Sequence, residues 1–499
     1  MKKLFIISML LTTAFSCEES EFNERRFNSS HRVKILGKKL ENPYSVKNMT
    51  KAWEKLKEKG RIKGDELEIT TTHYYVRHLP ENEESLSQLK SDTTVTFYDF
   101  PLDYEIVQEG DYFHDPTIPE EKPTFQYVSI PAGKEILTDI QSEIIENLFI
   151  PDEYKDDSSE ERIANEEIIE DLVDEAFRIT GNSENQVSDN LKTNSSKWRP
   201  AGTIRVFDDT FGYNYYRPVQ GVEVKARRWF TTHKGITNEL GCYSCDGRFK
   251  RDANYSLEWD RHHFALREGW LDKANIDGPK KKGNWDLDLS GGVSAFHAKV
   301  FMAAYHYYYK EIKGLRRPPQ NGTLNTKLRI RCYDEKNEEI NGNHKEERRF
   351  LGLGSQIKIY NPQNRMSDIY ATTIHEIAHA SHWNMWKDGD LFDNTDKIVK
   401  ESWASGVEWE LTRMIWPNYT IFYGRKKGGS SDPIFNYTGV VQDMIDGIGV
   451  NDQVEGYNIR QIEDALRGNK IWNNWRNNIK NNNNNGTENN LDALFDYWN

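Results

Sequence analysis

The stretch Thr372-Thr-Ile-His-Glu-Ile-Ala-His-Ala-Ser-His-Trp383 places two histidines four residues apart, with a glutamate directly after the first. In an α-helix, residues i and i+4 lie one above the other on the same face, so His375 and His379 can both reach one tetrahedral cation such as Zn²⁺. Glu376 lies about a hundred degrees round the helix from His375, where its carboxylate can address a metal-bound water. Neither Pro nor Gly interrupts residues 367–386, so the sequence predicts one continuous helix there.

Zinc needs a third protein ligand, and a second predicted helix at 397–416 offers two candidates. His382 lies about one turn beyond the expected metal position and is predicted to line the cleft instead. Glu401 belongs to a polar stripe beside an apolar arc. Antiparallel packing of the two helices through their apolar arcs would bring Glu401 to the histidine pair, so Glu401 is the predicted third ligand. Glu408 shares the stripe and is the alternative, either as the ligand or as a group that orients a histidine.

This arrangement resembles the gluzincin metallopeptidases, in which a glutamate some twenty residues past the second histidine completes the zinc site. The gap between His379 and Glu401 is 22 residues. Ser405 stands where gluzincins often carry an aspartate that orients a histidine, and the longer metzincin motif is absent. The resemblance implies a zinc-dependent peptidase with a mainly α, zincin-like α+β catalytic domain at 285–499, in which Glu376 is the general base.

The resemblance also implies a side chain that stabilises the tetrahedral intermediate of amide hydrolysis. No histidine follows His382, which leaves Tyr423, Tyr437 and Tyr457, and Tyr437 is the preferred candidate. Zincins place the edge strand of a sheet ahead of the metal helix. By its position, the segment 356–360 would be that strand and would pair with an extended peptide or protein substrate.

The N-terminus has the pattern of a targeting segment. Lys2 and Lys3 precede an apolar stretch at 4–15 that is too short to span a bilayer, and Ser16-Cys17 follows. This order resembles a bacterial lipoprotein signal, whose cysteine is acylated, and the acidic residues after it resemble the surface-export signal of Bacteroidota lipoproteins. The resemblance implies a lipid anchor in the outer membrane and exposure at the cell surface. The alternative is an ordinary cleaved signal in which Cys17 is incidental.

The rest of the chain is predicted to form several domains. Short strands with frequent turn signals predict a small β-sandwich. Its pattern, Gly-x-Ile-x-Val-x-Asp from Gly202, then Pro218-Val-x-Gly-Val-x-Val, then Thr237-x-x-x-Gly, resembles carboxypeptidase regulatory-like (prealbumin-like) domains, which are structural or adhesive. The predicted order is a signal peptide ending at the lipidated cysteine (1–17), a tether (18–42), an α+β domain of unknown role (43–180), the β-sandwich (200–275) and the catalytic domain (285–499).

Charge and cysteine content narrow the class of protein. The formal net charge of −13 is spread over many short acidic runs, whereas a nucleic-acid-binding protein would show a clustered basic face. The cysteines are too few for a disulfide scaffold. Cys242-Tyr-Ser-Cys245 is therefore predicted to be either a local disulfide or two plain thiols.

Two other functions fit the same sequence. A non-catalytic surface lipoprotein for binding or adhesion would hold a structural or inactive metal site, although such a site needs no general base at Glu376. A zinc hydrolase that acts on a surface glycan or a cell-wall amide is the second alternative, because the motif alone does not define the substrate.

Overall fold

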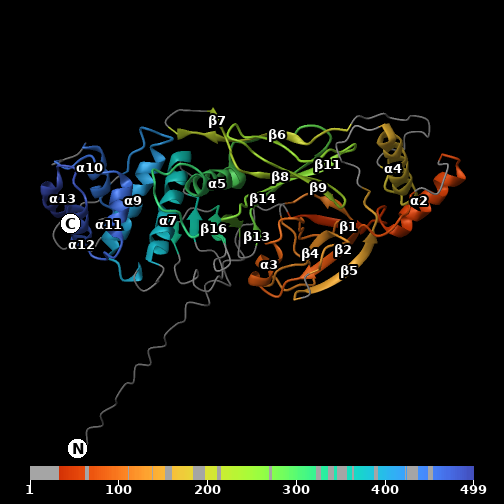
Figure 1. The fold of residues 1–499 in the computed structure, drawn as a ribbon, viewed down its shortest axis with the longest axis horizontal. Helices are drawn as coiled ribbons and strands as arrows, with labels where there is room; N and C mark the ends of the chain where they lie inside the picture. The colour runs from red at the N-terminus through yellow and green to blue at the C-terminus, as the bar shows by residue number, and fades with distance from the viewer. Residues whose placement is uncertain are drawn as a thin grey trace, which may run out of the picture.

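The computed structural model describes residues 33–499 except 62–66, 111, 137–138, 152–159, 184–196, 211–214, 269–271, 322–326, 335–341, 345–356, 362–364, 387–391, 422, 424–435 and 448–452. Within these residues the chain is a mixture of helices and several mainly antiparallel sheets, arranged as an elongated molecule (Figure 1). The predicted signal peptide, Cys17 and most of the predicted tether lie outside the described residues. No helix in the described part of the chain has both the length and the apolar character that crossing a bilayer requires.

The N-terminal part combines helices with two antiparallel sheets, the three-stranded β4-β2-β5 and the two-stranded β1-β3. Its core includes Phe230 from the sandwich, whose ring packs against Tyr44 and Tyr75, so the two parts share buried surface. The elements are β1 (Ile35–Lys39), α2 (Val46–Glu58), β2 (His73–Leu79), α3 (Glu83–Leu89), β3 (Tyr104–Gln108), β4 (Gln126–Pro131), β5 (Gln141–Leu148) and α4 (Glu160–Ile179).

The following segment forms two four-stranded sheets, one with the order β10-β6-β15 and β7 paired to β6, the other with the order β14-β11-β8-β9. Alternate residues such as Val206, Val224 and Leu257 are fully buried in a common core. Cys242 and Cys245 are free thiols, which decides between the two predicted alternatives. The strands are β6 (Ala201–Asp208), β7 (Tyr215–Pro218), β8 (Glu223–Arg228), β9 (Thr231–Ile236), β10 (Cys242–Ser244), β11 (Ala253–Glu258), β14 (Asn275–Lys281) and β15 (Leu287–Leu289).

A five-stranded sheet with the order β13-β12-β16-β18-β17 lies next to these two. Its three central strands are parallel, and both outer strands are antiparallel to their neighbours. The strands are β12 (Phe264–Glu268), β13 (Asp272–Lys273), β16 (Leu328–Tyr333), β17 (Gly342–His344) and β18 (Ile357–Tyr360).

The predicted boundary between sandwich and catalytic domain does not match these pairings. β12 and β13 fall inside the predicted sandwich range 200–275 but pair within the five-stranded sheet, whereas β14 and β15 return to the sandwich beyond that range. The reason is a long-range pairing, Phe264 with Leu328, which local strand patterns do not reveal.

The predicted edge strand is also corrected. The segment 356–360 contains β18, which lies between β16 and β17, so within the described residues the edge strand beside the helix that carries His375 is β17. The alternation of Ile357 and Ile359 identifies a strand but not its place in a sheet. β17 is only three residues long and begins with Gly342, so it carries no comparable pattern.

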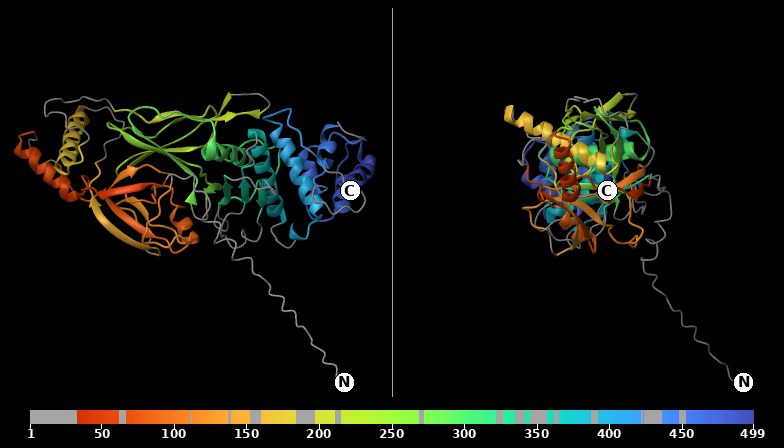
Figure 2. Two further views of the ribbon diagram at one scale, coloured as in Figure 1. Left: turned by 180° about the vertical axis from the view of Figure 1, so that it is seen from behind. Right: turned by 90° about the vertical axis from the view of Figure 1, so that its right-hand side faces the viewer.

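Helices α5 (Gly292–Tyr309), α7 (Met366–Trp386) and α9 (Lys397–Thr412) lie in this order between the sheets and the C-terminal helices (Figure 2). α7 packs between α5 and α9 and confirms the predicted helix at 367–386. α9 ends four residues before the predicted 416. The C-terminal helices are α10 (Val440–Asp446), α11 (Ile459–Leu466), α12 (Trp472–Asn482) and α13 (Leu491–Trp498).

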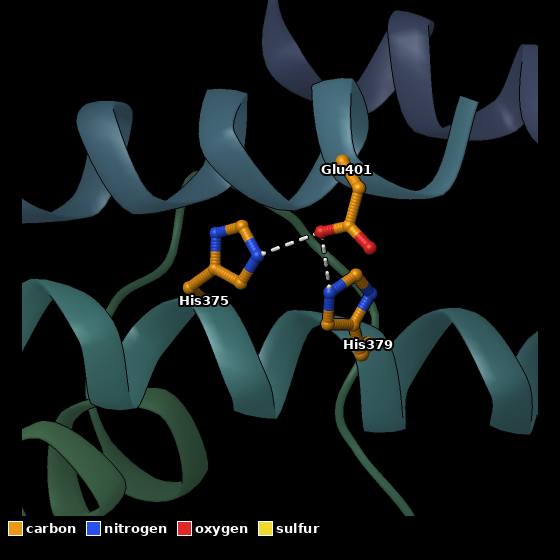
Figure 3. Close-up of side chains that lie close together, drawn as sticks. All are labelled: His375, His379 and Glu401. Carbon is orange, nitrogen blue, oxygen red and sulfur yellow. Dashed lines mark hydrogen bonds and ion pairs between the residues drawn. The ribbon is translucent and has the colours of Figure 1, made fainter. Parts of the chain in front are cut away.

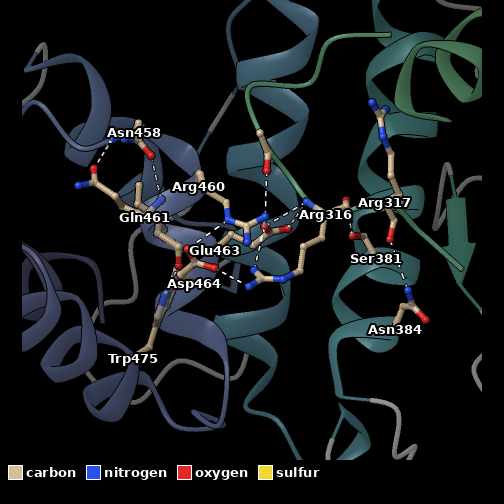
Figure 4. A network of polar contacts seen from close by, with 12 residues as sticks. Arg316, Arg317, Ser381, Asn384, Asn458, Arg460, Gln461, Glu463, Asp464 and Trp475 are labelled. Carbon is tan, nitrogen blue, oxygen red and sulfur yellow. Dashed lines mark hydrogen bonds and ion pairs between the residues drawn. The ribbon is translucent and has the colours of Figure 1, made fainter. Parts of the chain in front are cut away.

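A polar network fixes the C-terminal half of α7 to α11 (Figure 4). Ser381 of α7 donates a hydrogen bond to the carbonyl of Arg316 over 2.9 Å. The Arg316 guanidinium in turn pairs with Glu463 at 3.0 Å and with Asp464. Glu463 is almost fully buried, and it also accepts the Arg316 backbone N–H. This end of α7 therefore has a defined position relative to the C-terminal helices.

Gly406→Ala tests how tightly α9 packs against α10. A Cβ at Gly406 would lie 2.3 Å from Cγ1 and 2.4 Å from Cβ of Val441, so the helices would have to separate. Overpacking of this kind costs about 1–3 kcal/mol, and we expect a net destabilisation despite the roughly 1 kcal/mol gain in helix propensity. The measurement is thermal unfolding against Gly133→Ala, where a Cβ meets nothing within 4 Å. Equal melting temperatures for the two variants would contradict the expectation.

Candidate metal centre

Two histidines from α7 and one glutamate from α9 converge between the two helices (Figure 3). Nε2 of His375 and Nε2 of His379 each lie 3.2 Å from Oε2 of Glu401. The first histidine also contacts Glu408, further along α9, so the two helices run antiparallel, as the sequence predicts. The three residues that the sequence predicts as ligands are therefore brought together.

The spacing of these donor atoms fits a zinc ion. Two nitrogens and one carboxylate oxygen, all within 4.8 Å of one another, form the donor set. Ligands bound at about 2.0–2.1 Å in a tetrahedron are about 3.3 Å apart, close to the two nitrogen–oxygen distances observed. The imidazoles are nearly buried, with side chains 9% and 10% exposed, and the Glu401 side chain is 22% exposed. The donors therefore face a partly open space and can leave a fourth position for water or substrate.

Glu408 orients a histidine and does not join the ligand group. Its Oε2 lies 3.0 Å from Nδ1 of His375, on the opposite side of the ring from Glu401, and its Oε1 accepts a hydrogen bond of 2.7 Å from the Tyr419 hydroxyl. A carboxylate that holds the far nitrogen fixes the ring orientation and the tautomer of a metal-binding histidine. Ser405, four residues past Glu401, is buried and has no such contact with either histidine. Sequence reasoning did not find Tyr419, because it follows the end of α9 in an irregular segment.

The two carboxylates also determine the charge of His375. Burial lowers its pKa, but hydrogen bonds to Glu401 and Glu408 outweigh burial and raise the pKa well above the usual range. The same contacts, with the charge of His379, lower the pKa of Glu401 despite its burial. Without a cation, the centre is thus a pair of imidazole rings around an ionised carboxylate.

We expect zinc affinity to increase from about pH 6 to about pH 8. Because its pKa is raised well above the usual range, the folded protein favours His375 with a proton on both nitrogens, and a cation must displace the proton on Nε2. Each proton released makes the apparent affinity about tenfold stronger per pH unit. Competition titration with a chromophoric chelator at several pH values measures this slope. An affinity that stays constant with pH would show that binding displaces no proton from His375 and would contradict this expectation.

Glu376 lies beside the ligand group and directly against the edge strand. It is only 6% exposed. Its Cγ and Oε1 would each be 2.7 Å from a Cβ at Gly342, so only glycine allows β17 to approach the carboxylate this closely. Burial raises the pKa of Glu376 to about 7, with the two histidines opposing this shift. A carboxylate with this pKa is suited to accept and release a proton near neutral pH.

Tyr437 also borders the centre. Its ring centroid lies 5.9 Å from that of His375, and the residue is 36% exposed. Burial and then the charges of Glu401 and Glu376 raise the pKa of the phenol, which places it close to both acids. The neighbouring Thr438 hydroxyl donates to Ser402 Oγ of α9 over 2.8 Å, so α9 positions the segment that carries Tyr437.

The other predicted side chains lie elsewhere. Tyr423 is half-buried near Glu408, with its ring 6.1 Å from that of Trp498, and Tyr457 has Glu488 as its main charged neighbour. The prediction that His382 lines the cleft is wrong, because its side chain is fully buried and its ring packs edge-on against Phe392 at 5.2 Å. Because α7 continues without a break past His379, the His382 ring packs against Phe392, which precedes α9.

Two comparisons of the chain with known proteins found no match. No protein-family model matches the chain, and no curated protein matches it. The chemical interpretation therefore depends on the geometry of the centre itself.

Proposed function

We propose that this chain is a zinc-dependent peptidase with a gluzincin-like catalytic domain. The observation that carries the proposal is the convergence of His375 and His379 with Glu401 at zinc-ligand spacing, with Glu376 immediately beside them. A site that only stabilised the fold would need no buried carboxylate of raised pKa next to the ligands. The donor set and this carboxylate together favour hydrolysis over a purely structural role.

Zinc, when bound, would polarise the attacking water and the scissile carbonyl. Glu376 would accept a proton from that water and pass it to the leaving amine, so that one carboxylate acts first as base and then as acid. Tyr437 would donate a hydrogen bond to the oxyanion of the tetrahedral intermediate. Glu408 would hold the proton on Nδ1 of His375 and keep the ring aligned.

The position of β17 supports a peptide substrate. β17 is the last strand in the sheet order of the described residues, and it passes next to Glu376. The outer side of an edge strand can pair with an extended peptide through backbone hydrogen bonds. We place the enzyme at the outer membrane, anchored through Cys17 and exposed to extracellular proteins or peptides, as the N-terminal sequence implies.

The test uses the full mature chain. We expect about one zinc ion per chain by elemental analysis. Incubation with a mixed protein substrate should generate new amino termini that labelling and mass spectrometry detect. Chelation should abolish the cleavage, and added zinc should restore it. Stoichiometric zinc without any new termini would favour the non-catalytic surface lipoprotein, and release of glycan fragments or cell-wall amines instead would favour the other hydrolase.

A further inference from the structure

Three consecutive residues at the end of β6 and directly after it, Asp208, Asp209 and Thr210, contact α7 or the segment that follows α9. The second and third cap the first turn of α7: Oδ1 of Asp209 accepts the backbone N–H of Met366 over 2.8 Å, and Oγ1 of Thr210 accepts that of Ser367 over 3.0 Å. The first N–H groups of a helix have no partner within the helix, and a negative charge at this end is favourable. The start of α7 is therefore capped by residues that lie 157 positions away in the sequence.

The first of the three residues holds the segment that follows α9. Asp208 is fully buried, and its Oδ2 accepts a hydrogen bond of 3.0 Å from Nε1 of Trp416, which is itself fully buried. Arg217 of β7 pairs with the same carboxylate and lies over the Trp416 ring at 4.9 Å. The other oxygen of Asp208 accepts the N–H of Thr210 over 2.9 Å, which links this contact to the α7 cap.

The contact with the start of α7 and the contact with Trp416 after α9 therefore lie at the same end of the helix pair. Because α7 and α9 are antiparallel, the start of α7 lies beside the end of α9. The rings of Tyr370 and Trp416 meet there at 5.2 Å in a T-shaped contact. One segment of the sandwich, 208–210, therefore determines how the helix that carries the histidines sits against the helix that carries Glu401.

We propose that Asp208, Asp209 and Thr210 are positioning residues for the metal centre, so that the sandwich is a working part of the catalytic unit and not a separate adhesive module. This inference rests on the proposed function. Met366 lies nine residues before His375, about 14 Å along the helix axis. The network around Arg316 fixes the opposite half of α7, so a change at the capped end tilts the helix and does not simply shift it. Metal sites need their ligands within about 0.5 Å of the productive geometry, so a small tilt is sufficient to weaken binding.

The experiment compares two buried threonines of the sandwich in the full chain. Thr210→Val removes the hydroxyl oxygen that accepts the backbone N–H of Ser367 in α7. Thr237→Val is the control, because Thr237 is also buried and its Oγ1 also accepts a backbone N–H, that of Val222 over 2.8 Å, but within the sandwich. Its hydroxyl also donates to the Val219 carbonyl over 2.7 Å, so we expect Thr237→Val to lose at least as much thermal stability as Thr210→Val. Only Thr210→Val should bind zinc about tenfold or more weakly and cleave more slowly at saturating zinc. Thr210→Ser, which keeps the hydroxyl, should restore both properties.

Asp209 provides a second test if Thr210→Val does not fold. Its side chain is 41% exposed, so Asp209→Ala is expected to fold and to weaken zinc binding, while Asp209→Asn keeps the acceptor oxygen and should bind as the wild type does. Equal zinc affinity in wild type, Thr210→Val and Asp209→Ala would overturn the inference and leave the proposed function intact. A wild-type chain that binds no zinc would overturn both.

Discussion

Replacing Glu376 with glutamine is expected to lower kcat/KM for peptide cleavage by about a thousandfold and to leave zinc bound. The amide keeps the shape of the side chain but accepts no proton from the attacking water, and general base catalysis contributes about 10²–10⁴ to the rate. The ligands His375, His379 and Glu401 are unchanged. The measurement is a progress curve on a fluorogenic peptide, together with zinc content by elemental analysis.

The stability of the same variant separates a chemical effect from a structural one. Burial raises the pKa of Glu376 to about 7, which means that the folded protein disfavours its charge. Glu376→Gln removes that charge, so the melting temperature should stay the same or rise. A variant that keeps zinc and melts normally but still cleaves at the wild-type rate would rule out Glu376 as the base.

Glu401→Gln is expected to remove most of the bound zinc and, with it, most of the activity. The change takes away the only anionic donor in the ligand group, whose oxygen contacts both histidines at 3.2 Å. The two neutral imidazoles that remain would have to hold the cation with a weakly donating amide. Isothermal titration with zinc and residual cleavage at micromolar zinc measure the loss.

Glu408→Gln is the matched control, since it makes the same chemical change on the same helix. This residue contacts the far nitrogen of His375 and accepts a hydrogen bond from Tyr419, and the loss of such an orienting partner costs about 10–100-fold in metal affinity. Glu401→Gln should therefore bind zinc more weakly than Glu408→Gln. The reverse order would make Glu408 the ligand, which is the alternative that the sequence leaves open.

The two predictions together test whether the centre works as a unit. Under the proposed function, we expect Glu376 to affect the reaction, Glu401 to affect the binding of the cation, and Glu408 to affect the alignment of one ligand. Each of the three carboxylates interacts with the histidine pair in a different way. If all three changes lowered the zinc content equally, the result would indicate a structural metal site.

The sequence alone identified His375, His379 and Glu376 as a candidate site, and it placed Glu401 ahead of Glu408 as the candidate third ligand. These assignments depend on local geometry, because the spacing of His375 and His379 on one helix fixes which face they share. The polar stripe on the second helix then restricts the third ligand to Glu401 or Glu408. Two helices with complementary apolar arcs, joined by a short connection, have few ways to pack, so the antiparallel arrangement followed as well.

Only the tertiary structure decided which of the two glutamates faces the ligands and which holds the ring from behind, since both lie on the same stripe of α9. It also decided that β17 and not β18 is the edge strand among the described residues, that β12 pairs with β16, and that Asp209 and Thr210 cap α7. Each of these depends on contacts between segments far apart in the chain. The periodicity of apolar residues indicates which face of a helix or strand is buried. Which other element covers that face depends on the packing of the whole molecule.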